Sequence, residues 1–268
     1  MSSYISLTYS DLLLASIFLA MNALFSILLR LRLERQLVVS ALRMIAQLLL
    51  VGLVLKTIFT LASPWLTLLA AAIMVTFAGR EIFARQDRRL HGVWGIGLGG
   101  TSMLVAGTIV TVFALTTQIK PTPWWSPQFA LPLFGMILGN TMTGVSLGLD
   151  TLHTALHRER HSIEAKLLLG STRWEAVSPA LRRAVRSGFT PIINAMAATG
   201  VVSLPGMMTG QILSGVDPQD AVKYQILITL LIGGATGLGV LAASLASVCR
   251  LTDNRDRLRL DRLAAPRN

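Results

Sequence analysis

The chain has few charged residues and a single cysteine, and each shortage excludes a class of protein. Charged residues make up only 14% of its 268 residues, whereas an ordinary soluble domain carries about 25%. Because 53% of the residues are hydrophobic, a water-soluble domain of this length would have too little charge to cover its surface. Cys249 alone forms neither an intrachain disulfide nor a cysteine cluster for zinc or iron–sulfur. It leaves the redox compartment open.

The sequence also lacks the short motifs of common nucleotide-binding and hydrolytic sites. It contains no G-x-x-x-x-G-K-[ST] loop, so we do not expect this chain to hydrolyse ATP. Neither H-E-x-x-H nor G-x-S-x-G is present. The glycines of residues 95–100 lie inside an apolar run with no strand before it, which favours close helix packing over a nucleotide loop. We therefore expect no catalytic residue in this chain and no cofactor bound by it.

Seven apolar runs are present instead, and about 20 apolar residues are enough to cross a bilayer as a helix. They cover residues 12–29, 37–61, 65–83, 93–117, 128–152, 191–213 and 221–249. The first run has no basic residue before it and no small-residue cleavage site after it, which favours a retained span over a signal peptide. The sequence thus predicts an all-α, polytopic membrane protein with about seven transmembrane helices, forming one transmembrane domain over residues 1–268.

Positive charge is concentrated in alternate loops. The chain has a net charge of +11, and twenty of its 24 lysine and arginine residues lie at the ends of, or after, runs one, three, five and seven. The other four are Arg43, Lys56, Lys120 and Lys223. Because cytoplasmic loops carry the excess of basic residues, we expect the N-terminus outside and the C-terminus in the cytoplasm. The basic residues thus indicate orientation in a lipid bilayer, and no nucleic-acid partner is expected.

The one long basic loop, residues 153–188, predicts a cytoplasmic hairpin of two short helices. Gly170 suits the left-handed position that ends the first helix. Thr172 and Glu175 have the spacing of a capping box that begins the second. Such a hairpin either rests on lipid phosphates as an interfacial amphipathic element or docks a soluble partner. Residues 250–268 form a basic cytoplasmic tail.

The residues around this hairpin carry a family resemblance. The segment EAKLLLG at 164–170 is similar to the E-A-A-x-x-x-G signature of ABC-transporter permeases, although Lys166 replaces its third residue and its downstream Leu-Pro part is absent. Four further segments are GMILGNTM at 135–142, GVVSLPGMMTG at 200–210, GVDP at 215–218 and AVKYQI at 221–226. Together they resemble the FetB family of bacterial iron-export ABC permeases, which has plant relatives linked to aluminium tolerance. The resemblance covers nearly the whole chain and is strongest over 132–230.

This resemblance implies the permease subunit of an ATP-driven exporter of iron or another metal ion in the bacterial inner membrane. It implies two copies of this chain together with two separate ATPase subunits, which hold the ATP and magnesium. The expected ATPase-docking residues are Glu164, Ala165, Gly170, Ser171 and Trp174. Export of a non-metal cargo, such as a nucleotide sugar or an amphiphile, and transport without ATP are the alternatives that the sequence leaves open.

The sixth apolar run is the one most interrupted by proline and glycine, which break a helix. At membrane depth, such breaks are tolerated where the backbone is buried or lines a cavity. Ser203 and Pro205 are therefore candidates for a gate on the translocation path, and a packing kink is the alternative. Asn140 and Met142 of the fifth run join this path, because a polar amide in the middle of a span is costly. A hydrogen bond from Asn140 to another helix is the alternative.

Two sets of residues are candidate metal ligands. Met207 and Met208 offer soft sulfur atoms to a metal cargo, although methionines more often fill gaps in a core. His153, His157 and His161 recur at every fourth residue, which would place them on one stripe of a helix. A solvated cytoplasmic face is the alternative explanation for the histidines.

Overall fold

The computed structural model describes residues 8–253 and 255–265, and over these residues it is all-α with no strand. The chain divides into two compact units, residues 1–62 and residues 63–268. The all-α, polytopic class predicted from the sequence is confirmed.

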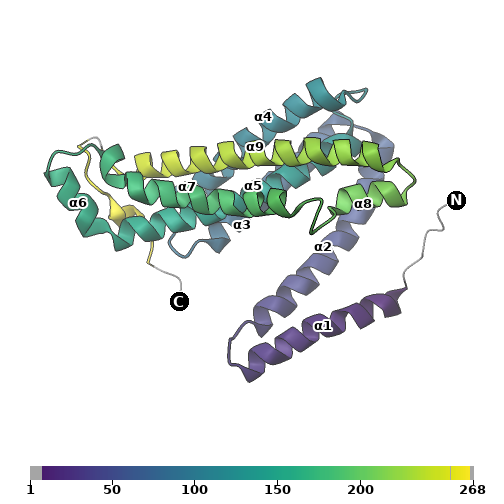
Figure 1. Cartoon of the computed structure of the whole chain (residues 1–268), viewed down its shortest axis with the longest axis horizontal. Helices are drawn as coiled ribbons and strands as arrows, with labels where there is room; N and C mark the ends of the chain where they lie inside the picture. Colours follow the sequence, from purple (N-terminus) through teal and green to yellow (C-terminus); the bar gives the residue numbers. More distant parts are fainter. Residues whose placement is uncertain (1–7, 254, 266–268) are drawn as a thin grey trace. The chain divides into compact units, whose positions relative to one another are not determined.

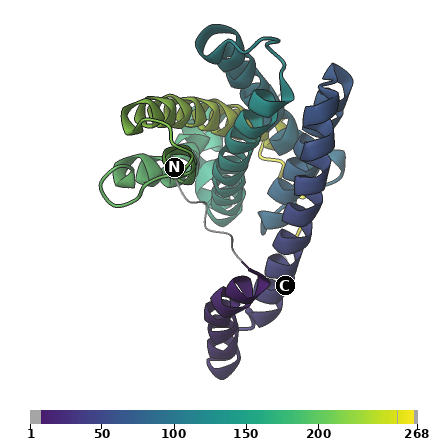
Figure 2. The same ribbon diagram turned by 90° about the vertical axis from the view of Figure 1, so that its right-hand side faces the viewer.

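The first unit is a pair of apolar helices, α1 (Tyr9–Leu28) and α2 (Glu34–Leu61). Figure 2 shows the two helices joined by a short turn. The turn is fixed by Ser26, whose hydroxyl accepts the Leu33 N–H at 2.9 Å and donates to the Glu34 carboxylate at 2.8 Å. Most apolar side chains of both helices are exposed within this unit, which is the surface expected of helices that face lipid or another membrane helix.

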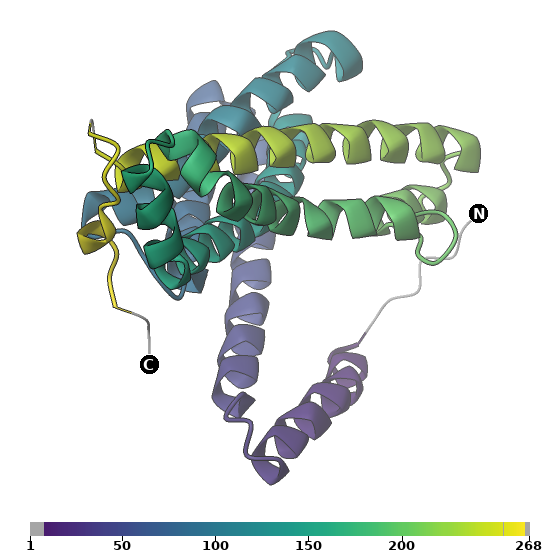
Figure 3. The same ribbon diagram turned by 60° about the vertical axis from the view of Figure 1, so that its left-hand side comes forward.

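The second unit contains seven α-helices among its described residues, together with two short helical turns. They are α3 (Pro64–Arg85), α4 (Val93–Phe113), the π-helical turn η1 (Ala114–Ile119), α5 (Pro127–Arg158), α6 (Arg160–Leu168), α7 (Arg173–Ala198), α8 (Gly206–Leu213), α9 (Pro218–Leu251) and the 3-10 turn η2 (Leu260–Arg262). Helices α5, α7 and α9 lie side by side along the unit (Figures 1 and 3). Helices α3 and α4 pack against α5, and α4 also packs against α9. Helix α6 and the C-terminal segment lie at one end of the unit, whereas α8 lies at the other (Figure 1).

Helices α5 and α7 approach closely because glycines face each other across the contact. A Cβ atom built on Gly144 would lie 2.8 Å from the carbonyl oxygen of Gly188, and one built on Gly188 would lie 2.8 Å from the carbonyl oxygen of Gly144. Val240 of α9 packs against the same point, within 2.7 Å of a Cβ at Gly188. Small residues allow this close backbone approach, which is how membrane helices gain packing energy without a hydrophobic driving force.

Six helices are long and apolar enough to cross a membrane, judged by length and composition over the described residues. They are α1, α2, α3, α4 with η1, α5 and α9, and they coincide with six of the seven predicted runs. The run at 191–213 has a different structure. Its first part is the end of α7, and its last part is the short helix α8, separated by a non-helical elbow at residues 199–205.

The predicted hairpin is more closely tied to the membrane helices than its sequence indicates. The second helix of the hairpin does not end at residue 188, the predicted limit. It is the first part of α7, which continues without a break from Arg173 to Ala198, through Pro179 and Pro191. Its first helix, α6, follows α5 after the single non-helical residue Glu159. Both arms of the hairpin are therefore attached directly to long helices.

The described part of the basic tail folds back onto the second unit. The His91 N–H donates to the Arg262 carbonyl at 2.9 Å, and the Ala264 N–H donates to the Arg89 carbonyl at 2.7 Å. Leu263 is buried beside Leu90 in the same core cluster as α5 and α9. The tail thus holds the turn between α3 and α4.

Candidate functional site

The tip of the α6–α7 hairpin is a tight turn built on Gly170. Gly170 has a φ of +91°, and its N–H donates to the Leu167 carbonyl at 3.1 Å. The Ser171 N–H donates to the Lys166 carbonyl at 3.0 Å. A left-handed glycine after the last turn is a common way to end a helix. The prediction that Gly170 ends the first arm is confirmed.

A capping box then begins α7. The Thr172 backbone N–H and hydroxyl donate to the Glu175 carboxylate at 2.8 and 2.9 Å, and the Glu175 N–H donates back to the Thr172 hydroxyl at 3.3 Å. These hydrogen bonds from the backbone and side chain of Thr172 lower the pKa of Glu175. The box sets the direction in which α7 leaves the turn.

The tip of the hairpin is apolar and unprotected. Leu168 and Leu169 are 89% and 86% exposed, and Trp174 is also exposed. Glu164, Ala165 and Gly170 are exposed on the same hairpin, and Ser171 is half-buried. The structure therefore brings the expected docking residues together on one protruding tip. Leu168 and Leu169 were missed by sequence reasoning because they lie in the x positions of the signature, and only the fold shows that they point away from the core.

The base of the hairpin, by contrast, is anchored. Ile163 is buried in the core cluster of the second unit. Arg183 of α7 forms an ion pair with Glu159, the residue between α5 and α6. Beside the tip, Arg173 of the first turn of α7 lies 3.4 Å from the carboxylate of Asp256 in the tail. A force applied at the tip would therefore be passed to α5, α7 and the tail.

A polar stripe runs along one side of the α5–α7 pair. It starts at the hydrogen bond in which the Thr151 hydroxyl donates to the Ser187 hydroxyl at 3.0 Å. From there Thr143 and Asn140, which are three residues apart, follow on α5. Thr190 and Asn194, which are four residues apart, follow on α7. The antiparallel packing of Gly144 against Gly188 makes Asn194 level with residues near 140. We call Asn140, Thr143, Thr190 and Asn194 the polar stripe.

The polar stripe faces outwards from the chain. Asn140, Thr190 and Asn194 are exposed, and Thr143 is half-buried. Asn140 donates its side-chain N–H to the Met136 carbonyl of its own helix at 2.8 Å, which leaves its amide oxygen available. Polar side chains within a membrane span usually face a protein interior or a water-filled cavity. The stripe therefore indicates a surface that something other than lipid tails covers.

The elbow between α7 and α8 is closed by its own backbone. The Ser203 N–H donates to the Ala198 carbonyl at 3.1 Å, and the Ser203 carbonyl accepts the Gly200 N–H at 2.9 Å. Pro205 is the N-cap of α8 in an extended conformation. Pro205 thus starts a new helix, where the sequence indicated a kink within one.

The residues predicted to form the translocation path do not gather at one point. Asn140 and Met142 face different sides of α5, since Asn140 is exposed and Met142 packs against the core of the second unit. Ser203 and Pro205 lie on the elbow, several residues beyond the level of Asn140 on α7. The structure adds Thr143, Thr190 and Asn194 to the candidate path.

Among the residues that the structure describes, neither the two methionines nor the three histidines predicted as metal ligands belong to a cluster of metal-binding side chains. In the described part of the chain, no group of three His, Cys, Asp or Glu residues is placed to hold a metal ion. Met207 packs against the core cluster around Ile192 and Ile228, and Met208 is half-buried on α8. His161 lies in α6 and not in α5, so the three histidines do not share one helix.

His153 has a structural position that the sequence did not indicate. It is fully buried, and its Nδ1 lies 2.9 Å from the Arg88 carbonyl while its Nε2 lies 2.7 Å from the Ser247 hydroxyl. Because a carbonyl oxygen only accepts, the ring carries its proton on Nδ1 and accepts the Ser247 hydroxyl at Nε2. One turn earlier, Asp150 accepts the Asp87 N–H at 2.8 Å. These contacts join α5 to α9 and to the turn after α3.

Replacing His153 with leucine is expected to lower the free energy of unfolding by about 1–3 kcal/mol for each buried group left unpaired. The Arg88 carbonyl and the Ser247 hydroxyl would both lose their partner. Thermal unfolding of the purified chain measures the loss. His157→Leu, one turn along on a half-buried position, is the matched control and should change stability little. Equal stability of the two variants would contradict the structural role of His153.

Comparison with known proteins places the whole helical region in one family. The model of the uncharacterised protein family UPF0014 matches residues 9–251. "UPF0014 membrane protein slr1647" of Synechocystis is 42% identical over 193 residues, which are 71% of this chain and 73% of that protein. "Probable iron export permease protein FetB" of Escherichia coli is 31% identical over 255 residues, which are 94% of this chain and 95% of that protein.

A plant protein is similar to nearly as much of the chain. "UPF0014 membrane protein STAR2" of rice is 33% identical over 232 residues, which are 86% of this chain and 79% of the rice protein. No solved structure matches this chain.

Proposed function

Since this chain belongs to the uncharacterised protein family UPF0014, a family of membrane proteins, we propose that it is the permease subunit of an ATP-driven exporter of iron or another metal ion. The name of its Escherichia coli relative, an iron export permease, supports this cargo. The observation that carries the proposal is the exposed apolar tip at Leu168 and Leu169. Exposed leucines on a basic loop mark a surface that a protein partner or the membrane covers, and we propose that a protein partner covers these two.

The partner that we propose is a separate ATPase, present in two copies, which holds ATP and magnesium. The permease has no P-loop of its own, so its movement comes from outside. In this proposal the chain binds no cofactor. The distribution of lysine and arginine supports a cytoplasmic hairpin and C-terminus and an external N-terminus in the bacterial inner membrane.

The assembly that we propose contains two copies of the permease, which meet along the polar stripe. One chain presents the stripe on its outer side, and a two-fold axis would place a second stripe opposite it. The space between the two stripes would then be lined by amide and hydroxyl groups that replace part of the hydration shell of a cargo ion. Weak ligands of this kind suit an exporter, because the cargo has to be released.

The continuity of α7 supplies the mechanical link. Its first turns belong to the hairpin, and its last turns carry Thr190 and Asn194. When the ATPase dimer closes on ATP, a displacement of the hairpin tip moves the whole helix. The elbow at residues 199–205 lets the end of α7 move relative to α8, since the two helices are separate.

The function is tested in inverted membrane vesicles that contain the permease and its ATPase. We expect ATP-dependent accumulation of radioactive iron, and none when either subunit is absent. ATPase activity stimulated by a nucleotide sugar or an amphiphile, but not by iron or other metal ions, would contradict the metal cargo. It would leave the proposed coupling of the permease to the ATPase in place. Accumulation without any ATPase would contradict the proposal as a whole.

Replacing Asn140 and Asn194 together with leucine is expected to reduce this accumulation at least about tenfold, because the loss of a polar contact to a desolvated ion costs more than about 1.4 kcal/mol. The exposed positions of both residues mean that the chain should still fold. Asn22→Leu, the same change at an exposed position of α1, is the matched control. Unchanged transport in the double variant would remove the stripe from the path.

A further inference from the structure

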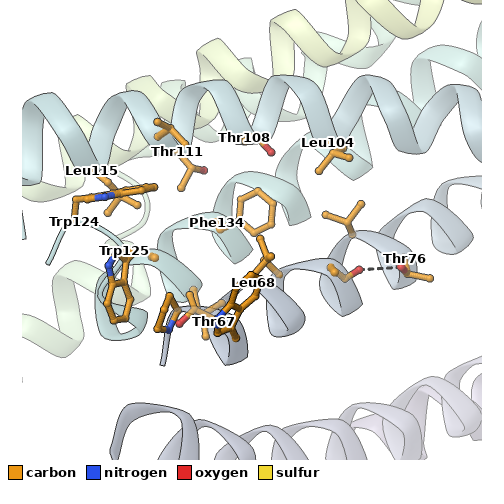
Figure 4. A pocket seen from close by; sticks show the side chains of 18 residues that line it. Thr67, Leu68, Thr76, Leu104, Thr108, Thr111, Leu115, Trp124, Trp125 and Phe134 are labelled. Atoms are coloured by element: carbon orange, nitrogen blue, oxygen red, sulfur yellow. Dashed lines mark hydrogen bonds between the residues drawn. The ribbon is translucent and has the colours of Figure 1, made fainter. Parts of the chain in front are cut away.

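A cavity of about 760 Å³ opens between α3, α4 and the start of α5. Its volume is within the range of ligand sites in proteins, about 300–1,000 Å³. Figure 4 shows Trp124, Trp125 and Leu115 at one end of the cavity, Leu104 and Thr76 at the other end, and Phe134 between them. No charged residue lines it. The site lies away from the polar stripe and from the hairpin, and neither proposal above uses it.

The end of the cavity near the tryptophans has a polar group without a partner. Thr111 is buried, and its hydroxyl has no hydrogen-bond partner among the described residues. Two other threonines of the wall differ, since the hydroxyls of Thr67 and Thr76 donate to carbonyls of residues four positions earlier. Thr111 lies beside Leu115, near Trp124 (Figure 4). The unpaired Thr111 hydroxyl lies behind the surface of the wall, so the wall that a ligand would meet at this end is largely apolar.

A positive charge marks the same end. Lys120 is the only Asp, Glu, Lys or Arg residue between Arg89 and Asp150, and its backbone N–H donates to the carbonyl of Leu115, a residue of the wall, at 3.0 Å. Lys120 is exposed, and its left-handed backbone conformation ends η1. Tryptophan side chains favour the level of the lipid headgroups, and a lysine at this level attracts anionic headgroups.

We propose that this cavity binds an acyl chain of an anionic phospholipid, with the lipid phosphate at Lys120. An uncharged, apolar wall fits a hydrocarbon chain. The indoles and the lysine at one end of the cavity suit the interfacial part and the headgroup of the lipid. The bilayer is as apolar as the cavity, so burial of the tail gives little selectivity. The headgroup decides which lipid binds.

The test is native mass spectrometry of the detergent-solubilised chain after addition of phosphatidylglycerol or phosphatidylcholine. We expect the wild type to retain one phosphatidylglycerol molecule per chain, and to prefer it over phosphatidylcholine by about fivefold, the effect of about 1 kcal/mol from one lysine. Lys120→Gln should remove this preference. Thr108→Phe, which fills the cavity from an exposed position of its wall, should remove the retained lipid.

Ile109→Phe is the matched control, because Ile109 is the next residue, exposed and outside the wall. It should retain lipid as the wild type does. Equal retention in the Thr108 and Ile109 variants would overturn the proposal, as would a headgroup preference that survives Lys120→Gln. A wild type that retains no lipid would also overturn it and would mean that protein closes the cavity in the assembled molecule.

Discussion

Replacing Leu168 and Leu169 together with aspartate is expected to abolish co-purification of the ATPase while the permease still folds and inserts. Both side chains are almost fully exposed in the free chain, so the folded permease loses little when they change. If both are buried against the ATPase, each contributes about 1.5–3 kcal/mol. Their loss therefore lowers the affinity by more than about a hundredfold. Affinity purification of the tagged permease and ATPase assays of the complex measure both effects.

Val93→Asp is the control for this experiment. Val93 is 86% exposed at the first turn of α4, which follows the basic loop that lies on the same proposed side of the membrane as the hairpin. An added carboxylate at a helix N-terminus is tolerated or slightly favourable. Normal coupling in the double leucine variant would contradict the docking proposal and favour a hairpin that rests on lipid. The leucines are a cleaner probe than Gly170, because any side chain at a φ of +91° also strains the turn.

The sequence was sufficient to predict the six helices that are long and apolar enough to cross a membrane, whereas the seventh predicted span, at 191–213, is not one helix. In a bilayer the backbone N–H and C=O groups of a lipid-exposed segment have to be paired within that segment, so an apolar run of sufficient length favours a helix. This is why α2, α5 and α9 begin and end within a few residues of the predicted limits, apart from the cytoplasmic extension of α5 to Arg158. The run at 191–213 is the exception, because its glycines and Pro205 allow the break at residues 199–205. The hairpin turn was also predictable, because Gly170 and the capping box act locally.

Which side of each helix faces the core was not predictable from the sequence in the same way. Asn140 and Met142 are two residues apart, which turns them about 200° from each other on a helix. Only the packing of α5 against α7 and the core shows which of them faces outwards. A single sequence does not contain this information, because apolar residues on both sides of a membrane helix satisfy lipid and protein equally well.

His153 illustrates a second limit. Its partners, Arg88 and Ser247, are 65 and 94 residues away in the sequence. A histidine stripe next to basic residues indicates a solvated face, and only the tertiary structure shows the first histidine buried between two other segments. The same limit applied to glycine pairs. Gly135 and Gly139 have the spacing of a packing motif, yet a Cβ at Gly139 would meet nothing within 4 Å. The mutual contact of Gly144 and Gly188 instead joins the fifth run to the end of the predicted hairpin.

Gly188→Ala is expected to lower the free energy of unfolding of the second unit by about 1–3 kcal/mol, the usual cost of an added methyl group in a filled core. The new Cβ would lie 2.7 Å from Val240 and 2.8 Å from the carbonyl oxygen of Gly144. A side chain can be shortened to relieve the first contact, but the second is with backbone. Gly188→Ala combined with Val240→Ala should therefore not restore the stability of the wild type. Thermal or denaturant unfolding of the purified chain in detergent measures the loss.

Gly139→Ala is the matched control on α5, in the interior of a helix with open space around the added methyl group. Because alanine is a better helix former than glycine, by up to about 1 kcal/mol, this variant should be as stable as the wild type or more stable. The contrast between the two glycines isolates the contact from the general effect of the substitution. If Gly188→Ala were as stable as Gly139→Ala, α5 and α7 would lie farther apart than the glycine contact requires. The hairpin would then have no rigid connection to the polar stripe, and the coupling through α7 would lose its structural basis.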